Sequence, residues 1–292
     1  MSGYEVELVL DAHAELGEGP IWDHRSSELI WLDILASEVH RFDPATGRDS
    51  AVDVGSHVGA AALRAEGGAV LAVRDGFATL EAGSGAARPL SKVGDNANRL
   101  RFNDGRCDSR GRFWAGTMAY DGRRGAGTLY RLERDHQVAA MLAGVTISNG
   151  IGWSPDDRTL YYIDTPTGCV DAFDYEPEAG ELGRRRRLVR VEAAEGLPDG
   201  MAVDAEGFLW VAVWGGWAVH RYDGEGRLDR TVRMPVSKVT SCAFGGPDLD
   251  ELFITSASTG LTAEELARQP HAGALFRHRA RVHGRPEHMY RG

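Results

Sequence analysis

The segment Leu197–Trp210 reads LPDGMAVDAEGFLW, and residues 101–114 have the same form, RFNDGRCDSRGRFW. Each contains an apolar run, a tight turn with Asp and Gly, and a second apolar run rich in β-branched and aromatic residues. A further run of this composition follows within about 15 residues in both cases, GTLYRLE from Gly127 and AVHRYDG from Ala218. Apolar runs bounded by Gly and Asp are typical of strands joined by turns, so both segments predict β-hairpins.

The same unit recurs along the chain. Aligned on the turn, its copies begin at Glu18, Gly59, Asn103, Asn149, Asp199 and Thr240, which are 41 to 50 residues apart. Six strand-rich copies with this period predict an all-β six-bladed β-propeller, because one copy cannot bury both of its faces. A linear β-solenoid is the alternative, but its repeats are usually much shorter. Since no linker or low-complexity segment interrupts the copies, we expect residues 1–292 to form a single domain.

The two ends of the chain supply the strands that a closed ring needs. The run YEVELVL, residues 4–10, precedes the first copy and has no partner there. The tail RARVHG, from Arg279, also resembles a strand. Because an open blade exposes a sheet edge, we expect residues 4–10 to pair into the last blade. The clearest helix signal is Leu261–Gln269, where Thr262 and Glu265 form a capping-box pair and Pro270 ends the helix.

Composition limits the possible partners. Asp and Glu number 43 against 33 Lys and Arg, and the net charge of −10 argues against nucleic acid. No apolar stretch approaches the roughly 20 residues that span a bilayer, so no membrane partner is expected. The N-terminus carries no basic export signal, and three cysteines without CxxC spacing suit a reducing compartment. We therefore expect a cytoplasmic protein; its oligomeric state is not predicted.

The phase of the repeat brings polar residues together. The first strand of each blade lines the central channel of a propeller, so residues at the same phase converge on one end of the axis. Four of the six phased positions carry oxygen donors: Glu18, Asn103, Asn149 and Asp199. Carboxylate and amide oxygens favour a hard cation such as calcium, magnesium or manganese. The alternative is that these Asx-Gly pairs only form turns, although Glu18 is a poor turn residue.

Other sites have weaker support. The chain has no G-x-S-x-G, H-E-x-x-H or P-loop motif. His57, two residues before a phased position, lies where it can reach the channel mouth, although a histidine beside a turn is usually structural. The run Arg184–Arg187 predicts a solvated edge strand, with an anionic ligand site as the alternative.

Several motifs together resemble a known family. LGEGPIWD from Leu16, the segment at Arg101, SNGIGWSPD from Ser148 and the segment at Leu197 are similar to those of the senescence-marker-protein/gluconolactonase family of regucalcin-like sugar lactonases. TSAS from Thr255 and RQPHAGALF from Arg268 resemble its C-terminal signature. The resemblance covers essentially the whole chain and implies a six-bladed propeller with one divalent cation in its channel.

The resemblance also implies roles for individual residues. Glu18, Asn149 and Asp199 match the metal ligands, and Arg101 and Asn103 match residues that hold sugar hydroxyls. The family often places a glutamate after AGTM as a substrate contact, and Asp121 would take that role here with a shorter reach. The loop from Ala119 to Gly127 would act as a lid. Calcium is the expected cation, with zinc, magnesium, manganese or ferrous iron as alternatives.

The implied activity is that of a hydrolase in carbohydrate metabolism, a gluconolactonase-like lactonase that opens a sugar (aldono) lactone to the aldonic acid. The metal would polarise the carbonyl, and Asp199 would be the general base for water; a hydroxide on the metal is the competing nucleophile. The alternatives are a broader esterase or organophosphate hydrolase on the same metal site, a non-catalytic calcium-binding regulatory propeller, and an interaction scaffold. An esterase would favour an apolar pocket, whereas Arg101 and Asn103 suit a polyhydroxylated ligand.

Overall fold

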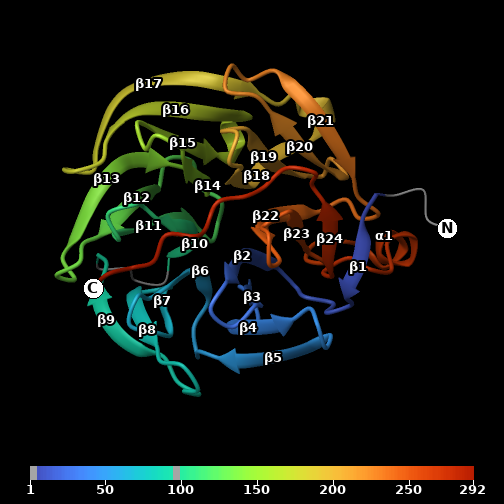
Figure 1. The fold of residues 1–292 in the computed structure, drawn as a ribbon, viewed down its shortest axis with the longest axis horizontal. Helices are drawn as coiled ribbons and strands as arrows, with labels where there is room; N and C mark the ends of the chain where they lie inside the picture. Colours follow the sequence, from blue (N-terminus) through green and yellow to red (C-terminus); the bar gives the residue numbers. More distant parts are fainter. Residues whose placement is uncertain (1–4, 95–98) are drawn as a thin grey trace.

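The structure is a computed structural model that describes residues 5–94 and 99–292. Within these residues the strands form six sheets of four antiparallel strands each, arranged as blades around a common axis (Figure 1). This confirms the predicted six-bladed β-propeller. No helix in the described part of the chain is long and apolar enough to cross a membrane.

In blades 1 to 5 the strands follow one another in chain order from the axis outward, and in blade 6 the outermost place is taken by β1. Blade 1 contains β2 (Gly17–Asp23), β3 (Glu28–Asp33), β4 (Glu38–Asp43) and β5 (Arg48–Asp53), and blade 2 contains β6 (Val58–Leu63), β7 (Ala69–Val73), β8 (Gly76–Leu80) and β9 (Arg88–Lys92). Blade 3 contains β10 (Leu100–Cys107), β11 (Phe113–Ala119), β12 (Gly127–Leu132) and β13 (Val138–Val145), and blade 4 contains β14 (Ser148–Trp153), β15 (Thr159–Asp164), β16 (Cys169–Glu176) and β17 (Glu181–Arg190). Blade 5 contains β18 (Leu197–Val203), β19 (Leu209–Trp214), β20 (Ala218–Tyr222) and β21 (Leu228–Arg233), and blade 6 contains β22 (Val239–Gly245), β23 (Glu251–Ser256), β24 (Leu275–Arg279) and β1 (Glu7–Leu10).

The first strand of every blade lies next to the first strand of the following blade, so these strands surround the axis. Apolar side chains fill the space between neighbouring blades. Trp210 of blade 5, for example, meets Phe244 of blade 6 edge to face, with ring centroids 5.8 Å apart. Because this packing is between blades, the copies stabilise one another around the ring.

The ring closes through the chain ends, as predicted. Strand β1 pairs antiparallel with β24, with Glu7 opposite Arg277 and Leu8 opposite Phe276. Of the expected 4–10 run, Glu7–Leu10 pair, and Tyr4 lies outside the described residues. The prediction of a strand from Arg279 was wrong, because β24 ends at that residue and the place beside it is taken by β1.

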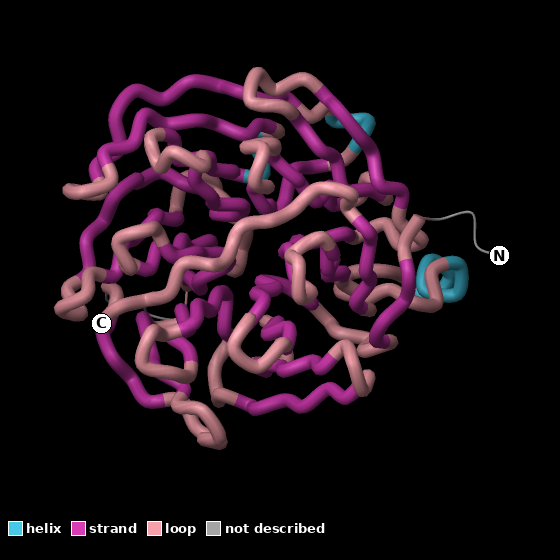
Figure 2. Tube along the Cα trace, in the orientation of Figure 1, coloured by secondary structure: helices cyan, strands magenta, loops and turns pink. Residues whose placement is uncertain are grey.

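Residues 280–292 instead cross the ring as an extended tail (Figures 1 and 2). The tail contacts the last residues of the inner strands or the turns after them, since Arg285 donates to the carbonyls of Trp153 and Ser154 at 3.3 Å. The amide of Tyr290 donates to the carbonyl of Leu63 at 2.8 Å. The tail therefore covers the end of the channel opposite to the first residues of the inner strands.

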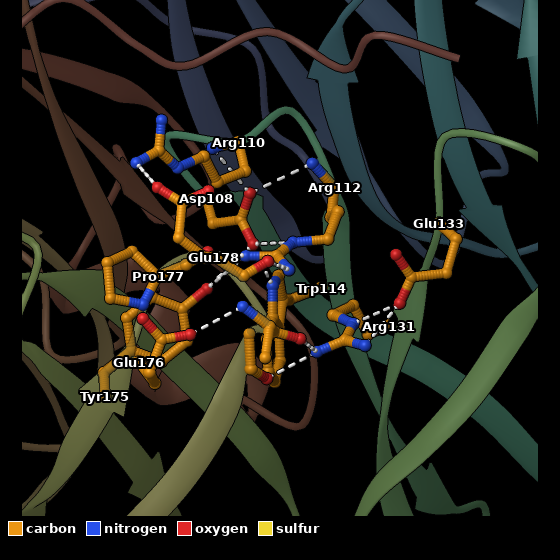
Figure 3. A network of polar contacts seen from close by, with 12 residues as sticks. Asp108, Arg110, Arg112, Trp114, Arg131, Glu133, Tyr175, Glu176, Pro177 and Glu178 are labelled. Carbon is orange, nitrogen blue, oxygen red and sulfur yellow. Dashed lines mark hydrogen bonds and ion pairs between the residues drawn. The ribbon is translucent and has the colours of Figure 1, made fainter.

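Buried polar clusters fix the turns at that same end. Asp108, fully buried after β10, accepts from Arg112 Nε at 2.6 Å, Trp114 Nε1 at 2.9 Å and the Tyr175 hydroxyl at 2.9 Å (Figure 3). Asp204, after β18, accepts in the same way from Trp210 Nε1 at 2.9 Å. Each of these two carboxylates accepts a hydrogen bond from an indole N–H and fixes the turn in which it lies, so both aspartates have a structural role.

Two smaller predictions are confirmed. Helix α1 (Ala263–Arg268) begins after Thr262, and Thr262 and Glu265 form the expected capping box. The arginine run 184–187 lies in β17, the outermost strand of blade 4, where Arg185 pairs with Asp171 at 2.6 Å. It is a solvated edge strand.

Candidate active site

The candidate site lies where the inner strands begin. Each inner strand departs from regular pairing with the second strand of its blade, and the irregularity falls on the phased position. The breaks lie between Glu18 and Ile21, Val58 and Ala60, Phe102 and Asp104, Asn149 and Ile151, Pro198 and Met201, and Val239 and Ser241. A β-bulge bends the strand and changes the direction of its side chains. The repeat therefore places a bulge under each phased residue.

Glycines after the phased residues let the inner strands approach closely. A Cβ atom on Gly150 would lie 2.8 Å from the carbonyl oxygen of Asp199, and one on Gly200 would lie 2.2 Å from Ser241 Oγ. Larger residues at these two positions would push neighbouring blades apart. The glycines that follow Asn149 and Asp199 are thus required by the spacing of the strands around the axis.

A chain of hydrogen bonds joins three of the predicted residues across blades 3 and 4. Arg101 Nη1 donates to Asn103 Oδ1 at 2.7 Å, and Asn103 Nδ2 donates to Asn149 Oδ1 at 3.0 Å. Asn149 Nδ2 donates in turn to Thr165 Oγ1 at 2.8 Å, and this hydroxyl donates to the carbonyl of Pro198 at 2.8 Å. These hydrogen bonds fix the orientation of the Asn103 and Asn149 side-chain amides, and they hold Asn149 Oδ1 among the inner strands.

The two predicted carboxylates lie within electrostatic range of each other. Glu18 and Asp199 are 3% and 5% exposed. Burial raises the pKa of both carboxyls well above the ordinary range, and repulsion raises it further, from Asp199 and Asp104 on Glu18 and from Asp104 on Asp199. Arg101 partly offsets this effect on both groups. Buried carboxylates that repel each other are unfavourable unless a cation or a proton neutralises them.

Asp199 has an atom with no partner. Its Oδ1 is buried and accepts no hydrogen bond among the described residues, whereas Glu18 Oε2 accepts only from the adjacent amide of Gly19, at 3.0 Å. A buried, unpaired carboxylate oxygen beside a second carboxylate and an amide oxygen fits a hard divalent cation. Within residues 5–94 and 99–292 no three His, Cys, Asp or Glu side chains are grouped as metal ligands; the predicted set has two carboxylates and one amide.

Asp104 lies within electrostatic range of Glu18 and Asp199, and the sequence analysis missed it. It is 9% exposed, and burial raises its pKa to about 6. The alignment assigned one residue per strand to the channel, and in blade 3 that residue was Asn103. The sequence signal was its position directly after the phased residue Asn103; in the structure the pairing of β10 with β11 is irregular between Phe102 and Asp104.

Asp121 is the predicted residue that the structure does not bring to the cluster. Its side chain is 66% exposed, and its Oδ1 accepts from the amide of Arg123, in its own loop, at 3.1 Å. The side chain beside it, Tyr120, contacts His57 instead. A substrate role for Asp121 therefore stays a prediction.

Known proteins are similar to most of this chain. The family model described as the SMP-30/Gluconolactonase/LRE-like region matches residues 16–258. The chain belongs to this family. Among its relatives, regucalcin of Xenopus laevis is 41% identical over 283 residues, which cover 95% of each chain.

Solved structures of the SMP-30/gluconolactonase/LRE-like family share the fold. A calcium-binding protein, regucalcin, from Agrobacterium tumefaciens has a TM-score of 0.95 and 30% identity, covering 99% of this chain and 98% of its own. A gluconolactonase from Xanthomonas campestris has a TM-score of 0.75 and 25% identity, covering 93% and 88%. The family thus contains proteins described by calcium binding and others described by lactone hydrolysis.

Proposed function

We propose that this propeller is a divalent-cation-dependent hydrolase that opens an aldonolactone to the aldonic acid. The observation that carries the proposal is the buried Asp199 carboxylate, with one oxygen unpaired, beside Glu18 and Asn149 and next to the Arg101–Asn103 pair. Gluconolactonase activity of a relative from Xanthomonas campestris supports the same reaction class.

Glu18, Asn149 and Asp199 would hold the cation, and calcium is the ion we propose. The three side chains offer oxygen atoms only, and the Agrobacterium relative is described as calcium-binding. When bound, the cation supplies a Lewis acid that polarises a carbonyl. It also removes the repulsion between the two carboxylates, which is strongest when both are ionised.

The chain's own residues then bind the lactone and move a proton. Arg101 donates hydrogen bonds to sugar hydroxyls, and Asn103 accepts one at Oδ1, because its two amide hydrogens are already bonded to the Ser148 carbonyl and to Asn149 Oδ1. The 2.7 Å bond between Arg101 and Asn103 fixes both side chains before the substrate arrives. Asp199 takes a proton from the attacking water. The water oxygen forms a bond to the carbonyl carbon, the ring ester bond breaks, and the alkoxy oxygen takes the proton held by Asp199, so that the aldonic acid leaves with Asp199 ionised again.

One assay tests the proposal. The protein is freed of metal with a chelator and assayed on pentono- and hexonolactones, with calcium, magnesium, manganese, zinc or ferrous ion and without any ion. We expect hydrolysis above the spontaneous rate only when a divalent ion is present. If no lactone is hydrolysed with any ion, the lactonase proposal is wrong.

The second candidate is a non-catalytic calcium-binding propeller, favoured by the calcium-binding description of the Agrobacterium regucalcin. The two candidates differ in what calcium binding does. Calorimetric calcium binding without turnover of any lactone or simple ester would favour the non-catalytic protein, whereas turnover of simple esters with no preference for lactones would favour a broader esterase.

A further inference from the structure

Tyr120 stands at the entrance of the candidate site in a fixed position. It follows β11 directly, its side chain is 43% exposed, and its amide donates to the carbonyl of Arg99 at 3.1 Å. Arg101 lies opposite Met118 in the adjacent strand, so Tyr120 emerges at the end of blade 3 where the site lies. An exposed aromatic ring at a site entrance is either free to rotate or held by a neighbour.

His57 holds it. The Tyr120 hydroxyl and His57 Nδ1 are 2.8 Å apart, and the two ring centroids are 5.6 Å apart with planes inclined by 53°. His57 immediately precedes β6 of blade 2, and its carbonyl accepts from the amide of Arg74 at 3.0 Å. The pair therefore bridges two neighbouring blades, and each partner is tied to its own blade through the backbone.

The protonation of the pair follows from its surroundings. Burial, with the charges of Arg101 and Arg74, lowers the pKa of His57, so the imidazole is neutral near pH 7. Burial raises the pKa of the Tyr120 phenol despite the two arginines. The contact between the phenol and Nδ1 is therefore a hydrogen bond between two neutral groups. Both rings are neutral and both lie within electrostatic range of the Arg101 guanidinium that we assign to the substrate.

We propose that Tyr120, held by His57, forms an aromatic wall that contacts the C–H face of the bound lactone ring and sets which lactones are accepted. This inference rests on the proposed lactonase function. Arg101 and Asn103 recognise hydroxyl groups but leave the apolar face of a sugar ring without a partner. Sites for small molecules combine a few polar groups with aromatic walls, and a wall that is already fixed costs little entropy on binding. Tyr120 is thus a specificity-determining residue at the rim, where the resemblance placed Asp121.

The test compares Tyr120→Phe, Tyr120→Ala and His57→Ala with the calcium-loaded wild type on a pentonolactone and a hexonolactone. Tyr120→Ala should raise KM about tenfold, change kcat less than about twofold, and reduce the preference between the two lactones. Tyr120→Phe and His57→Ala keep the phenyl ring but release it, so each should raise KM a few-fold. Leu228→Ala is the control, because it removes an exposed apolar side chain, 52% exposed, from the outermost strand of blade 5.

A second measurement separates this inference from the lactonase proposal. Binding of a non-hydrolysable aldonolactam is measured by calorimetry for the wild type and the same variants. If the wild type binds the lactam and Tyr120→Ala weakens binding about tenfold, the wall is supported whether or not lactones are hydrolysed. If Tyr120→Ala binds the lactam as the wild type does, or keeps the wild-type KM and preference, the inference is overturned. If the wild type neither binds the lactam nor hydrolyses lactones, both proposals fail.

Discussion

Arg101 has two roles among the residues of the candidate site. It is a buried cation near Glu18 and Asp199, and it also fixes Asn103 through its guanidinium. The same nitrogen, Nη1, also donates to the carbonyl of Phe102 at 3.0 Å. A planar fork can make these bonds and still present donors to a substrate, whereas an ammonium group is a compact charge with a different reach.

Arg101→Lys should therefore lower kcat/KM while the protein stays folded. The substitution keeps the charge but loses the fixed hydrogen bond to Asn103. Hydrogen bonds to charged groups are worth about 1.5–3 kcal/mol, so we expect a loss of about 10- to 100-fold, mainly in KM. Steady-state kinetics on the best lactone would measure it. Unchanged kinetics would mean that Arg101 does not bind substrate.

Asp199→Asn tests the proposed base and ligand together. The amide cannot take a proton and is a weaker ligand, so we expect kcat to fall at least about 100-fold. Without metal, the variant should be at least as stable as the wild type at pH 7.5, because it removes one of the mutually repelling carboxylates. Thermal unfolding in chelator measures this second effect, which a merely misfolded variant would not show.

Glu66→Gln is the matched control, because its side chain is 84% exposed and far from the inner strands' first residues. It should change neither kcat nor the unfolding temperature measurably. If Asp199→Asn retains wild-type turnover, Asp199 is not the base.

The sequence repeat predicts equivalent positions of the inner strands, but it predicts neither bulges nor contacts between loops. Phase alone found Glu18, Asn103, Asn149 and Asp199, because a repeat aligns equivalent positions around an axis. It missed Asp104, since a bulge cannot be read from a two-residue alternation. The contact between Tyr120 and His57 joins loops of two different blades, and loop side chains are not placed by the repeat.

At the scale of elements, the C-terminal tail acts as a second closure of the ring. Tyr290 is fully buried against the core between blades 2 and 3, and its hydroxyl donates to the carbonyl of Glu133 at 2.7 Å. Arg106 of β10 pairs with Glu287 of the tail at 3.0 Å. Strand β1 thus completes the last blade, and the tail connects the inner strands at the end of the channel opposite to their first residues.

Tyr290→Ala should destabilise the protein by about 3–5 kcal/mol, because it removes a large, fully buried aromatic side chain. Tyr290→Phe removes only the hydroxyl and its hydrogen bond, so it should cost about 1 kcal/mol. Urea denaturation measures both. Equal effects of the two variants would contradict the assigned role of the ring.

The strands were predictable as elements, and the tail was not. Recurring apolar runs bounded by Gly and Asp predicted the blades and their order, since each hairpin depends on local sequence. The composition of RARVHG is also that of a strand, but pairing requires a free sheet edge. The edge of β24 that it would have used is taken by β1, so the chain beyond Arg279 crosses the ring instead.

At the scale of the whole molecule, stability should depend on pH and on calcium together. The pKa values of Glu18 and Asp199 are raised, and that of Asp104 is raised to about 6. At pH values above the ordinary pKa of a carboxyl group, the metal-free folded protein therefore binds more protons than the unfolded chain. Its stability therefore falls as pH rises through that window, because ionisation is less favourable in the folded state than in the unfolded one.

Calcium competes with these protons for the same oxygens, so its effect should grow with pH. At 100 times its Kd a ligand adds about 2.7 kcal/mol, which corresponds to a rise in Tm of about 5 °C. We expect a shift of this size at pH 7.5 and almost none at pH 4.5, measured by thermal unfolding in chelator and in excess calcium. Glu18→Gln should abolish most of the shift at pH 7.5 while leaving the metal-free protein folded. A shift that is independent of pH would show that calcium binds elsewhere on the acidic surface, because exposed carboxylates are already ionised at pH 4.5 to a large extent.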